Sequence, residues 1–185
     1  MLEFPKRYAD FVARLRVPSG FLIVIVFAWF SHPSTRSLVW GLPLALAGLL
    51  LRAWAAGCLA KDRQLSTSGP YAYTRNPLYL GTLTVAAGLV VASRNPLLGA
   101  LFAAVFLLVY LPVIQLEQQH LRRLFPEYAG YAARVPALLP RLTPGPQRNP
   151  RPFQFRLYLK NREYQAGTGL AAGMLFLLWK IASGH

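Results

Sequence analysis

The sequence predicts an all-α integral membrane protein with five transmembrane helices, an N-terminal amphipathic interfacial helix and short cytoplasmic helices. Two observations lead to this fold class. Of the 185 residues, 55% are hydrophobic and the mean hydropathy is +0.35, which is too apolar for an ordinary soluble domain. Five apolar runs also follow one another along the chain. The length suits a single domain over residues 1–185.

The first element, residues 1–17, is expected to lie in the membrane interface. Phe4, Phe11 and Leu15 fall on one helical face and basic residues on the others, which is typical of an interfacial amphipathic helix. Pro18 is expected to break this helix. No small-residue cleavage site follows the apolar run, so the segment does not resemble a signal peptide.

The five apolar runs are expected to cross the membrane in turn. The first is short for a span of about 20 residues, unless its flanking residues take part. The third and fourth runs begin with Asn-Pro, where asparagine suits the N-cap and proline suits the first helical position. Short connections predict antiparallel hairpins. The runs cover residues 19–31, 38–59, 78–92, 95–116 and 166–182, so spans one to four lie within 18–116.

Two longer polar segments, residues 60–77 and 117–165, are expected on the cytoplasmic side. Repeated prolines in the second segment predict short helices separated by turns. In the fifth run, Gly169 and Gly173 have the spacing of small residues at a helix contact. We expect them to pack against a helix of the same chain, with pairing of two chains as the alternative. The protein is therefore expected to be a monomer or a weak homodimer.

The basic residues are distributed unevenly about the predicted spans. The net charge is +14, and by this assignment 16 of the 20 lysines and arginines fall on one side, three fall on the other, and Arg52 lies inside the second span. The asymmetry predicts that the basic side is cytoplasmic, with the N-terminus inside. Five crossings then place the C-terminus outside, which is the periplasm if the compact chain lies in a bacterial inner membrane. The asymmetry also predicts anionic membrane lipids as partners, and no nucleic acid.

Cysteine and histidine usage argues against two kinds of site. The single Cys58 cannot form an internal disulfide, and we expect it to be a small buried residue near a helix end. His32, His120 and His185 are too scattered to predict a metal site.

The polar stretch 66–81 is the strongest candidate for a ligand site, because it lies between two hydrophobic blocks. Asn76 and Pro77 open the third run, which places Arg75 and Tyr79 at the N-terminus of a helix. Free N–H groups and the positive end of the helix dipole favour an anionic group of a ligand there.

Glu117 is the acidic residue that we expect to act in this site. A carboxylate close to hydrocarbon is costly, so it normally has a partner or a function: here a nearby arginine, or the ribose hydroxyls or ammonium of a ligand. Arg52 is expected to snorkel to the interface, with a salt bridge or an anionic ligand as alternatives. His120 is expected to be exposed, with proton transfer as the alternative. Tyr71 and Tyr79 are expected either in the interfacial aromatic belt or in a pocket, where ring faces attract a cation.

Two ordered blocks of residues resemble the isoprenylcysteine carboxyl methyltransferase and phospholipid methyltransferase superfamily of integral-membrane enzymes. The family pattern contains R-H-P-x-Y-x-G, followed some 30 to 40 residues later by E-E-x-x-L and a tyrosine-rich block. The resemblance covers about residues 50–140. The matching residues are Leu65, Tyr71, Arg75, Pro77, Tyr79 and Gly81 in the first block, and Glu117, Leu121, Phe125, Tyr128, Tyr131, Val135 and Pro136 in the second.

The resemblance implies an enzyme that binds S-adenosyl-L-methionine, releases S-adenosyl-L-homocysteine and methylates a lipophilic small molecule or lipid. It implies that Glu117 is the acid of the catalytic site and acts first of all as an anchor for the cofactor. It also implies that residues 117–165 cover the cofactor. The cofactor-binding residues implied by position are Leu65, Tyr71, Asn76, Pro77, Leu78, Tyr79 and Glu117, with Gln64 and Ser66 as weaker matches.

Three positions differ from the family pattern. Asn76 replaces the histidine before proline; it keeps a donor and an acceptor but cannot shuttle a proton. Gln118 replaces the second acid. Val113 replaces an arginine that the isoprenylcysteine enzymes associate with substrate, which argues against a prenylcysteine carboxylate as the acceptor. A lipid amine, a thiol, another carboxylate and a small hydrophobic metabolite stay open. Two further alternatives are an NADPH-dependent membrane reductase of the sterol reductase type and a non-catalytic lipid-binding scaffold.

Overall fold

The computed structural model describes residues 4–145 and 152–184, and every regular element in these ranges is helical. Residues 1–3 of the predicted interfacial helix, residues 146–151 of the second polar segment and His185 lie outside the described residues. The elements are α1 (Lys6–Phe30), α2 (Thr35–Gly57), η1 (Gly69–Ala72), α3 (Pro77–Ser93), α4 (Pro96–Val105), η2 (Phe106–Tyr110), α5 (Leu111–Leu124), α6 (Tyr128–Ala132), α7 (Phe155–Lys160) and α8 (Tyr164–Ala182).

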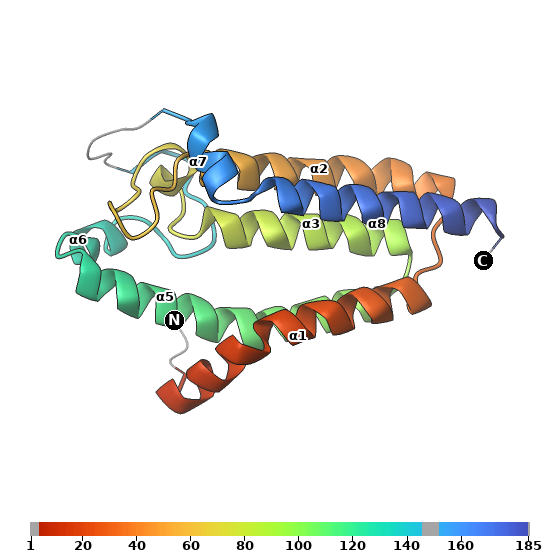
Figure 1. Cartoon of the computed structure of the whole chain (residues 1–185), viewed down its shortest axis with the longest axis horizontal. Helices are drawn as coiled ribbons and strands as arrows, with labels where there is room; N and C mark the ends of the chain where they lie inside the picture. The colour runs from red at the N-terminus through yellow and green to blue at the C-terminus, as the bar shows by residue number, and fades with distance from the viewer. Residues whose placement is uncertain (1–3, 146–151, 185) are drawn as a thin grey trace.

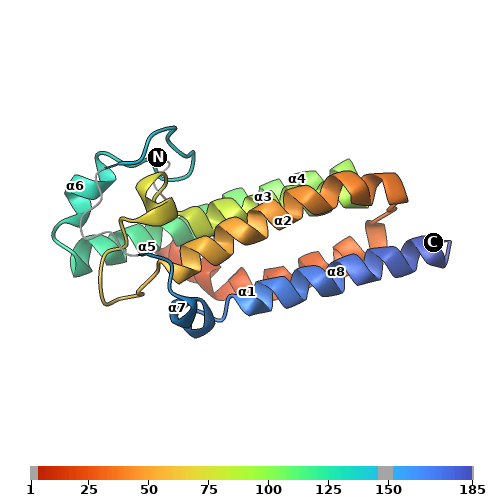
Figure 2. The same ribbon diagram turned by 90° about the horizontal axis from the view of Figure 1, so that it is seen from above.

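The long helices run roughly along one axis, and the short helices α6 and α7 are both at the same end of the bundle, apart from each other (Figures 1 and 2). We call this end the α6–α7 end. The C-terminus lies at the opposite end. The helix α2 packs against α3, α7 and α8, and α1 packs against α4, η2 and α5. This arrangement brings the end of α2, the start of α3 and the end of α5 to the same end of the molecule.

By length and composition, two described helices are able to cross a membrane: α2, and the continuous helix Pro96–Leu124 of 29 residues. A third is added if the two arms of α1 form one bent span. The described helices therefore include two or three candidate spans, and the five expected spans are not shown. At 17 residues, α3 is a shorter apolar helix. The helix α8 has polar residues at both ends, and it is not one of the helices counted as able to cross. The predicted continuation of the fourth run into a polar helix is confirmed.

The expected break at Pro18 is present as a bend within one helix, because α1 runs from Lys6 to Phe30. The arms Lys6–Leu15 and Pro18–Phe30 meet at 54°. A proline inside a helix removes one N–H and crowds a preceding carbonyl, which bends a helix without necessarily ending it. The first arm is held against α5, where the Gln115 side chain exchanges two hydrogen bonds with the Phe4 backbone (2.8 and 3.1 Å).

A second proline, Pro112, lies where the fourth apolar run changes its helical winding. Residues Phe106–Tyr110 form a π turn between α4 and α5. Because Pro112 has no N–H, the carbonyl of Leu108 four residues earlier lacks its usual helical partner. That carbonyl accepts a hydrogen bond from the Tyr8 hydroxyl of α1 at 2.8 Å instead. This hydrogen bond joins the π turn to the N-terminal arm of α1.

Glycines hold α2 and α3 in close contact over two helical turns. A Cβ atom added to Gly48 would lie 2.6 Å from the Gly81 carbonyl oxygen, and one added to Gly41 would lie 2.5 Å from that of Gly88. Only glycine permits this approach, because the neighbouring atoms are backbone atoms that cannot move aside. Gly169 and Gly173 have no such neighbour within 4 Å. The prediction that these two glycines pack closely within the chain was therefore wrong.

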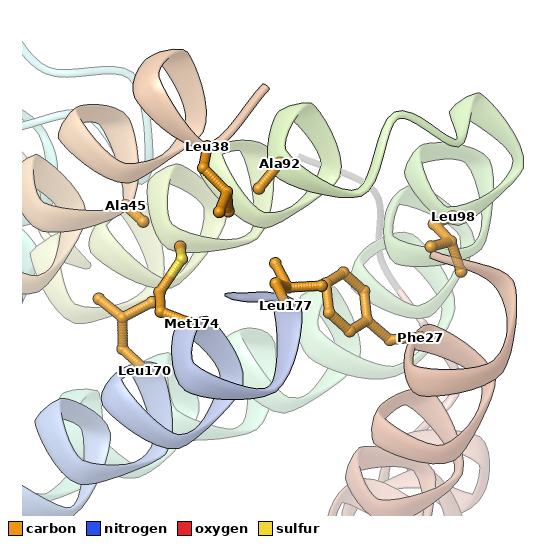
Figure 3. Close-up of a cluster of buried hydrophobic side chains, with 8 residues drawn as sticks. All are labelled: Phe27, Leu38, Ala45, Ala92, Leu98, Leu170, Met174 and Leu177. Carbon is orange, nitrogen blue, oxygen red and sulfur yellow. The ribbon is translucent and has the colours of Figure 1, made fainter. Parts of the chain in front are cut away.

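The apolar core lies at the other end of the bundle and joins α1, α2, α3, α4 and α8 (Figure 3). A buried lysine adds a polar link there: Lys180 of α8 donates to the carbonyl oxygens of Ala28 (3.0 Å), Trp29 (3.3 Å) and Ser31 (2.6 Å) at the end of α1. A cation is favourable at the negative end of a helix dipole. The core residues are Phe27, Leu38, Ala45, Ala92, Leu98, Leu170, Met174 and Leu177.

We predict opposite effects of alanine at two helical glycines. Gly48→Ala should cost about 1–3 kcal/mol of folding free energy, because its Cβ overpacks the α2–α3 contact. Gly169→Ala should be neutral or stabilising by up to about 1 kcal/mol, because nothing lies within 4 Å and alanine favours a helix. Unfolding of both variants in detergent checks this, and equal behaviour of the two would contradict the glycine contact.

Candidate functional site

A cavity of about 760 Å³, which we call the main cavity, lies at the α6–α7 end. Its walls come from α3, α5, α6 and the segment 59–66 that follows α2. This volume is within the range of small-molecule and cofactor sites. The structure brings all nine positions named from the sequence to its wall: Gln64, Leu65, Ser66, Tyr71, Asn76, Pro77, Leu78, Tyr79 and Glu117.

The start of α3 opens onto the main cavity. Asn76 is the N-cap residue and Pro77 the first residue of α3, as predicted, but the Asn76 side chain does not cap the helix. Its Nδ2 donates to the Ala137 carbonyl at 2.8 Å instead, because a distant loop competes for the amide. Pro77, Leu78 and Tyr79 in the first turn of α3 line the cavity. An anionic group there would meet the positive end of the helix dipole.

Hydrogen bonds join the segment that follows α6 to the polar stretch that precedes α3. The Thr74 hydroxyl donates to two carbonyls of this segment, both at 3.1 Å. The prediction of short helices separated by turns in 117–165 is confirmed for its described part by α6 and α7. Three backbone hydrogen bonds join the two segments: Arg75 to Pro136 (2.9 Å), Arg141 to Tyr73 (3.0 Å) and Gly145 to Ala72 (2.7 Å).

Buried tyrosines support the floor of the main cavity. The Tyr131 hydroxyl donates to the Tyr71 carbonyl at 2.7 Å, and both residues are buried. Burial raises the pKa of both phenols, so each hydroxyl keeps its proton and stays a donor. Nη1 of Arg75 donates to Tyr128 (3.4 Å) and Gln118 (3.5 Å). Burial also raises the pKa of Tyr128, although the Arg75 charge opposes this shift.

Glu117 and two aromatic rings line the wall on the α3–α5 side. Glu117 is exposed on the face of α5 that lines the cavity, whereas Val113, one turn earlier, is buried and is not among the lining residues. The rings of Tyr79 and Tyr110 meet edge-on with centroids 6.0 Å apart. Tyr110 ends the π turn, so that turn aims it at α3. The sequence spacing places Tyr110 on the same helical face as Glu117, although it does not mark Tyr110 as a site residue.

His120 and Asp62 form a pair at the rim of the main cavity. His120 Nε2 lies 3.2 Å from Asp62 Oδ1, and both side chains are more than half exposed. Asp62 has a positive φ of 57°, a left-handed conformation that aspartate adopts more readily than most other residues with a side chain. The expectation of an exposed His120 is confirmed. Sequence analysis missed Asp62, which lies 58 residues away in the chain.

Arg52 of α2 lines the main cavity and is bound by groups from α3 and from the residue that precedes α8. Its Nε lies 2.5 Å from Glu163 Oε1 next to α8, and its Nη1 donates to Thr82 Oγ1 and to the Leu78 carbonyl (3.3 Å) of α3. Of the alternatives for Arg52, the salt bridge is therefore present. Glu163 was not singled out, although it is one of only six acids in the chain and directly precedes the fifth apolar run.

Cys58 is buried beside this site, as predicted, and burial raises the pKa of its thiol. It ends α2 as the C-cap residue.

Within residues 4–145 and 152–184, no group of three or more histidine, cysteine, aspartate or glutamate side chains is placed to hold a metal ion.

Comparison with known proteins agrees with the two sequence blocks that line the main cavity. The phospholipid methyltransferase family model matches residues 19–128, which is more than half of the chain. The chain belongs to the phospholipid methyltransferase family. This span includes the α2–α3 pair, the open start of α3 and Glu117, so the family match and the cavity coincide. No solved structure matches the chain.

Two curated relatives share part of this family member's sequence. Cobalt-zinc-cadmium resistance protein CzcN of Cupriavidus metallidurans is 40% identical over 105 residues, which are 56% of the present chain and 47% of CzcN. Nickel-cobalt-cadmium resistance protein NccN of Alcaligenes xylosoxydans xylosoxydans is 36% identical over 117 residues, which are 62% and 54% of the two chains. The chain spans about half the length of the curated relatives it matches.

We predict that the Arg52–Glu163 pair stabilises the fold far more than the His120–Asp62 pair. Arg52→Gln should cost about 2–3 kcal/mol, because it leaves a buried carboxylate unpaired, and adding Glu163→Gln should recover part of this loss. Asp62→Asn should change stability by no more than about 0.5–1 kcal/mol, because that pair is solvated. Denaturant unfolding in detergent measures all three. Equal losses from Arg52→Gln and Asp62→Asn would contradict this ranking.

Proposed function

We propose that this protein is an S-adenosylmethionine-dependent methyltransferase that acts on a lipophilic acceptor at the membrane interface. One observation carries the proposal: all nine positions taken from two sequence blocks about 40 residues apart line a single cavity. The membership in the phospholipid methyltransferase family supports it. A scaffold without a ligand gives no reason for these side chains to converge.

The groups around the main cavity fit the chemistry of S-adenosylmethionine. Leu65 and Leu78 offer apolar contact for the adenine ring, and the first turn of α3 offers N–H donors to a carboxylate. Glu117 offers acceptors for ribose hydroxyls or the ammonium group. The faces of Tyr79 and Tyr71 would attract the positive sulfonium. When bound, this cofactor supplies a methyl group on a positively charged sulfur.

The protein's own contribution to methyl transfer is positioning. A displacement at a methyl carbon requires the acceptor atom to be held in line at about 3–3.5 Å. Tyr110, Leu116 and Thr82 extend the cavity along α3 and α5, which we propose as the lateral site of the acceptor. Glu117 is the candidate to take a proton if the acceptor is an ammonium; a thiolate or carboxylate needs no base.

Val113 supports an acceptor other than a prenylcysteine carboxylate. This residue stands where the isoprenylcysteine enzymes carry a substrate-associated arginine, and it is buried outside the cavity wall. The names of the two curated relatives concern resistance to metals. We propose that such an acceptor is a membrane component, since the cavity lies where the apolar helices end.

We also propose five membrane crossings, with the α6–α7 end in the cytoplasm of a bacterial cell and the C-terminus in the periplasm. The close packing of α3 along α2, and the course of α8 from the α6–α7 end to the opposite end, support it. Alkaline phosphatase fused after residue 185 should be active in the periplasm, and activity only in a cytoplasmic reporter would overturn this topology.

Ligand binding tests the cofactor assignment. In detergent, S-adenosylhomocysteine should bind the wild-type chain by calorimetric titration, and NADPH should not. Glu117→Gln should weaken binding by about 10–100-fold, the loss expected for a charge-assisted hydrogen bond. Glu127→Gln is the matched control, since Glu127 is an exposed acid that does not line the cavity. Stabilisation by NADPH alone would favour a reductase, and no binding of either would favour a scaffold.

Incubation with isotopically labelled methyl donor and a membrane lipid extract tests the reaction itself. Mass spectrometry should detect a labelled lipophilic product that is absent with Tyr79→Ala. The folded state of this variant is checked by its unfolding temperature, because Tyr79 also contacts Tyr110. A folded, cofactor-binding protein that labels nothing would contradict the proposed acceptor class.

A further inference from the structure

A second cleft lies beside the main cavity, on the other face of the segment that follows α2. It has a volume of about 450 Å³ and lies between segment 59–64 and α7. Four of its lining side chains are cationic and none of its lining residues in the described chain is acidic. The four cations are Lys61, Arg63, Arg156 and Lys160, and amide side chains are supplied by Gln64, Gln154 and Asn161.

The walls of this basic cleft are fixed to the end of α2. Asn161 Nδ2 donates to the carbonyl oxygens of Ala56 (2.9 Å) and Leu59 (3.0 Å), and the Gln154 N–H donates to that of Gly57 (2.9 Å). These bonds occupy carbonyls that the last turn of α2 leaves without helical partners. The cleft is therefore part of the folded structure and not a chance gap between two surface segments.

The acids near the basic cleft in sequence are engaged elsewhere. Asp62, between two of the cations, turns to the main cavity and pairs with His120 at 3.2 Å. Glu163, three residues after Lys160, is buried in the ion pair with Arg52. Positive charge in the cleft is thus not balanced by these carboxylates, and the complementary ligand is an anion.

The surroundings of the cleft favour an anion that belongs to a lipid. Figure 2 shows α7 beside the end of α2 and the start of α8. The cleft between segment 59–64 and α7 is therefore close to the ends of two apolar helices. Beside it, Phe153, Phe155 and Leu159 expose about half or more of their surface, and the Phe155 ring stacks on Tyr158 with centroids 5.6 Å apart. Exposed phenylalanine and leucine side chains beside basic residues are typical of segments that lie in the membrane interface.

We propose that the basic cleft binds the phosphate headgroup of an anionic phospholipid. Arginine and lysine together offer fixed and mobile donors to phosphate oxygens, and basic pockets at helix ends are favourable for anionic headgroups. The exposed aromatic residues of α7 then lie against the acyl chains. Segment 59–64 forms a wall of both the cleft and the main cavity, with Leu59, Lys61 and Gln64 lining both. A bound headgroup would thereby steady one wall of the main cavity.

The test measures bound lipid and requires no methyl transfer, so it can fail independently of the proposed function. The full chain is exchanged into nanodiscs of phosphatidylcholine with a fraction of phosphatidylglycerol, and native mass spectrometry counts retained lipids. The wild type should retain phosphatidylglycerol preferentially. Lys61→Gln with Arg63→Gln, or Arg156→Gln with Lys160→Gln, should each reduce this preference about tenfold or more. Unfolding temperatures of both double variants confirm that they fold.

The matched control is Arg122→Gln with Arg123→Gln, which removes the same charge from exposed residues at the end of α5 outside both cavities. It should retain phosphatidylglycerol as the wild type does. Equal loss of phosphatidylglycerol in the control and the cleft variants would show a general charge effect and overturn the proposal. Wild-type retention of phosphatidylglycerol by the cleft variants would overturn it too. Displacement of the lipid by millimolar inorganic phosphate would show a site for soluble phosphate and would also overturn it.

Discussion

The close contact between α2 and α3 is the constraint on which the rest of the structure depends. Backbones that approach this closely require glycine on both sides, and Gly41, Gly48, Gly81 and Gly88 supply it. The contact aligns the end of α2 with the start of α3. The 19 residues between these helices must therefore fold back over the same end of the bundle, which is where the main cavity forms.

Polar residues at both ends of the bundle add contacts between helices to the glycine contact of α2 and α3. Arg52 reaches from α2 to α3 and to Glu163 beside α8, so three helix ends converge on one guanidinium. At the opposite end, Lys180 holds the end of α1 against α8. A cation removed from water is costly when it is alone, and the buried Lys180 and the partly buried Arg52 are both satisfied by groups from elsewhere in the chain. The site is thus attached to a framework that fixes the relative positions of helices from both halves of the sequence.

The α6–α7 end carries two concave surfaces of different chemistry that share one wall. The main cavity is lined by aromatic and polar side chains and reaches between α3 and α5. The basic cleft is lined by cations and amides and faces α7. Segment 59–64 separates them: Leu59, Lys61 and Gln64 line both, whereas Asp62 lines only the main cavity and Arg63 only the basic cleft. A soluble cofactor and a membrane headgroup would therefore approach the same short segment from opposite sides.

The sequence alone determined the helical class and the Asn-Pro helix starts, because hydropathy and proline act locally. The nine positions that line the main cavity were implied by the resemblance to a family, and not by hydropathy or spacing. The sequence did not determine which partners the polar groups choose. Asn76 bonds a carbonyl 61 residues away and Arg52 an acid 111 residues away. Nor did it distinguish glycines that form a contact, such as Gly48, from glycines that do not, such as Gly169. Those outcomes depend on which helix faces meet, and that is decided only when segments distant in the chain compete for the same surface.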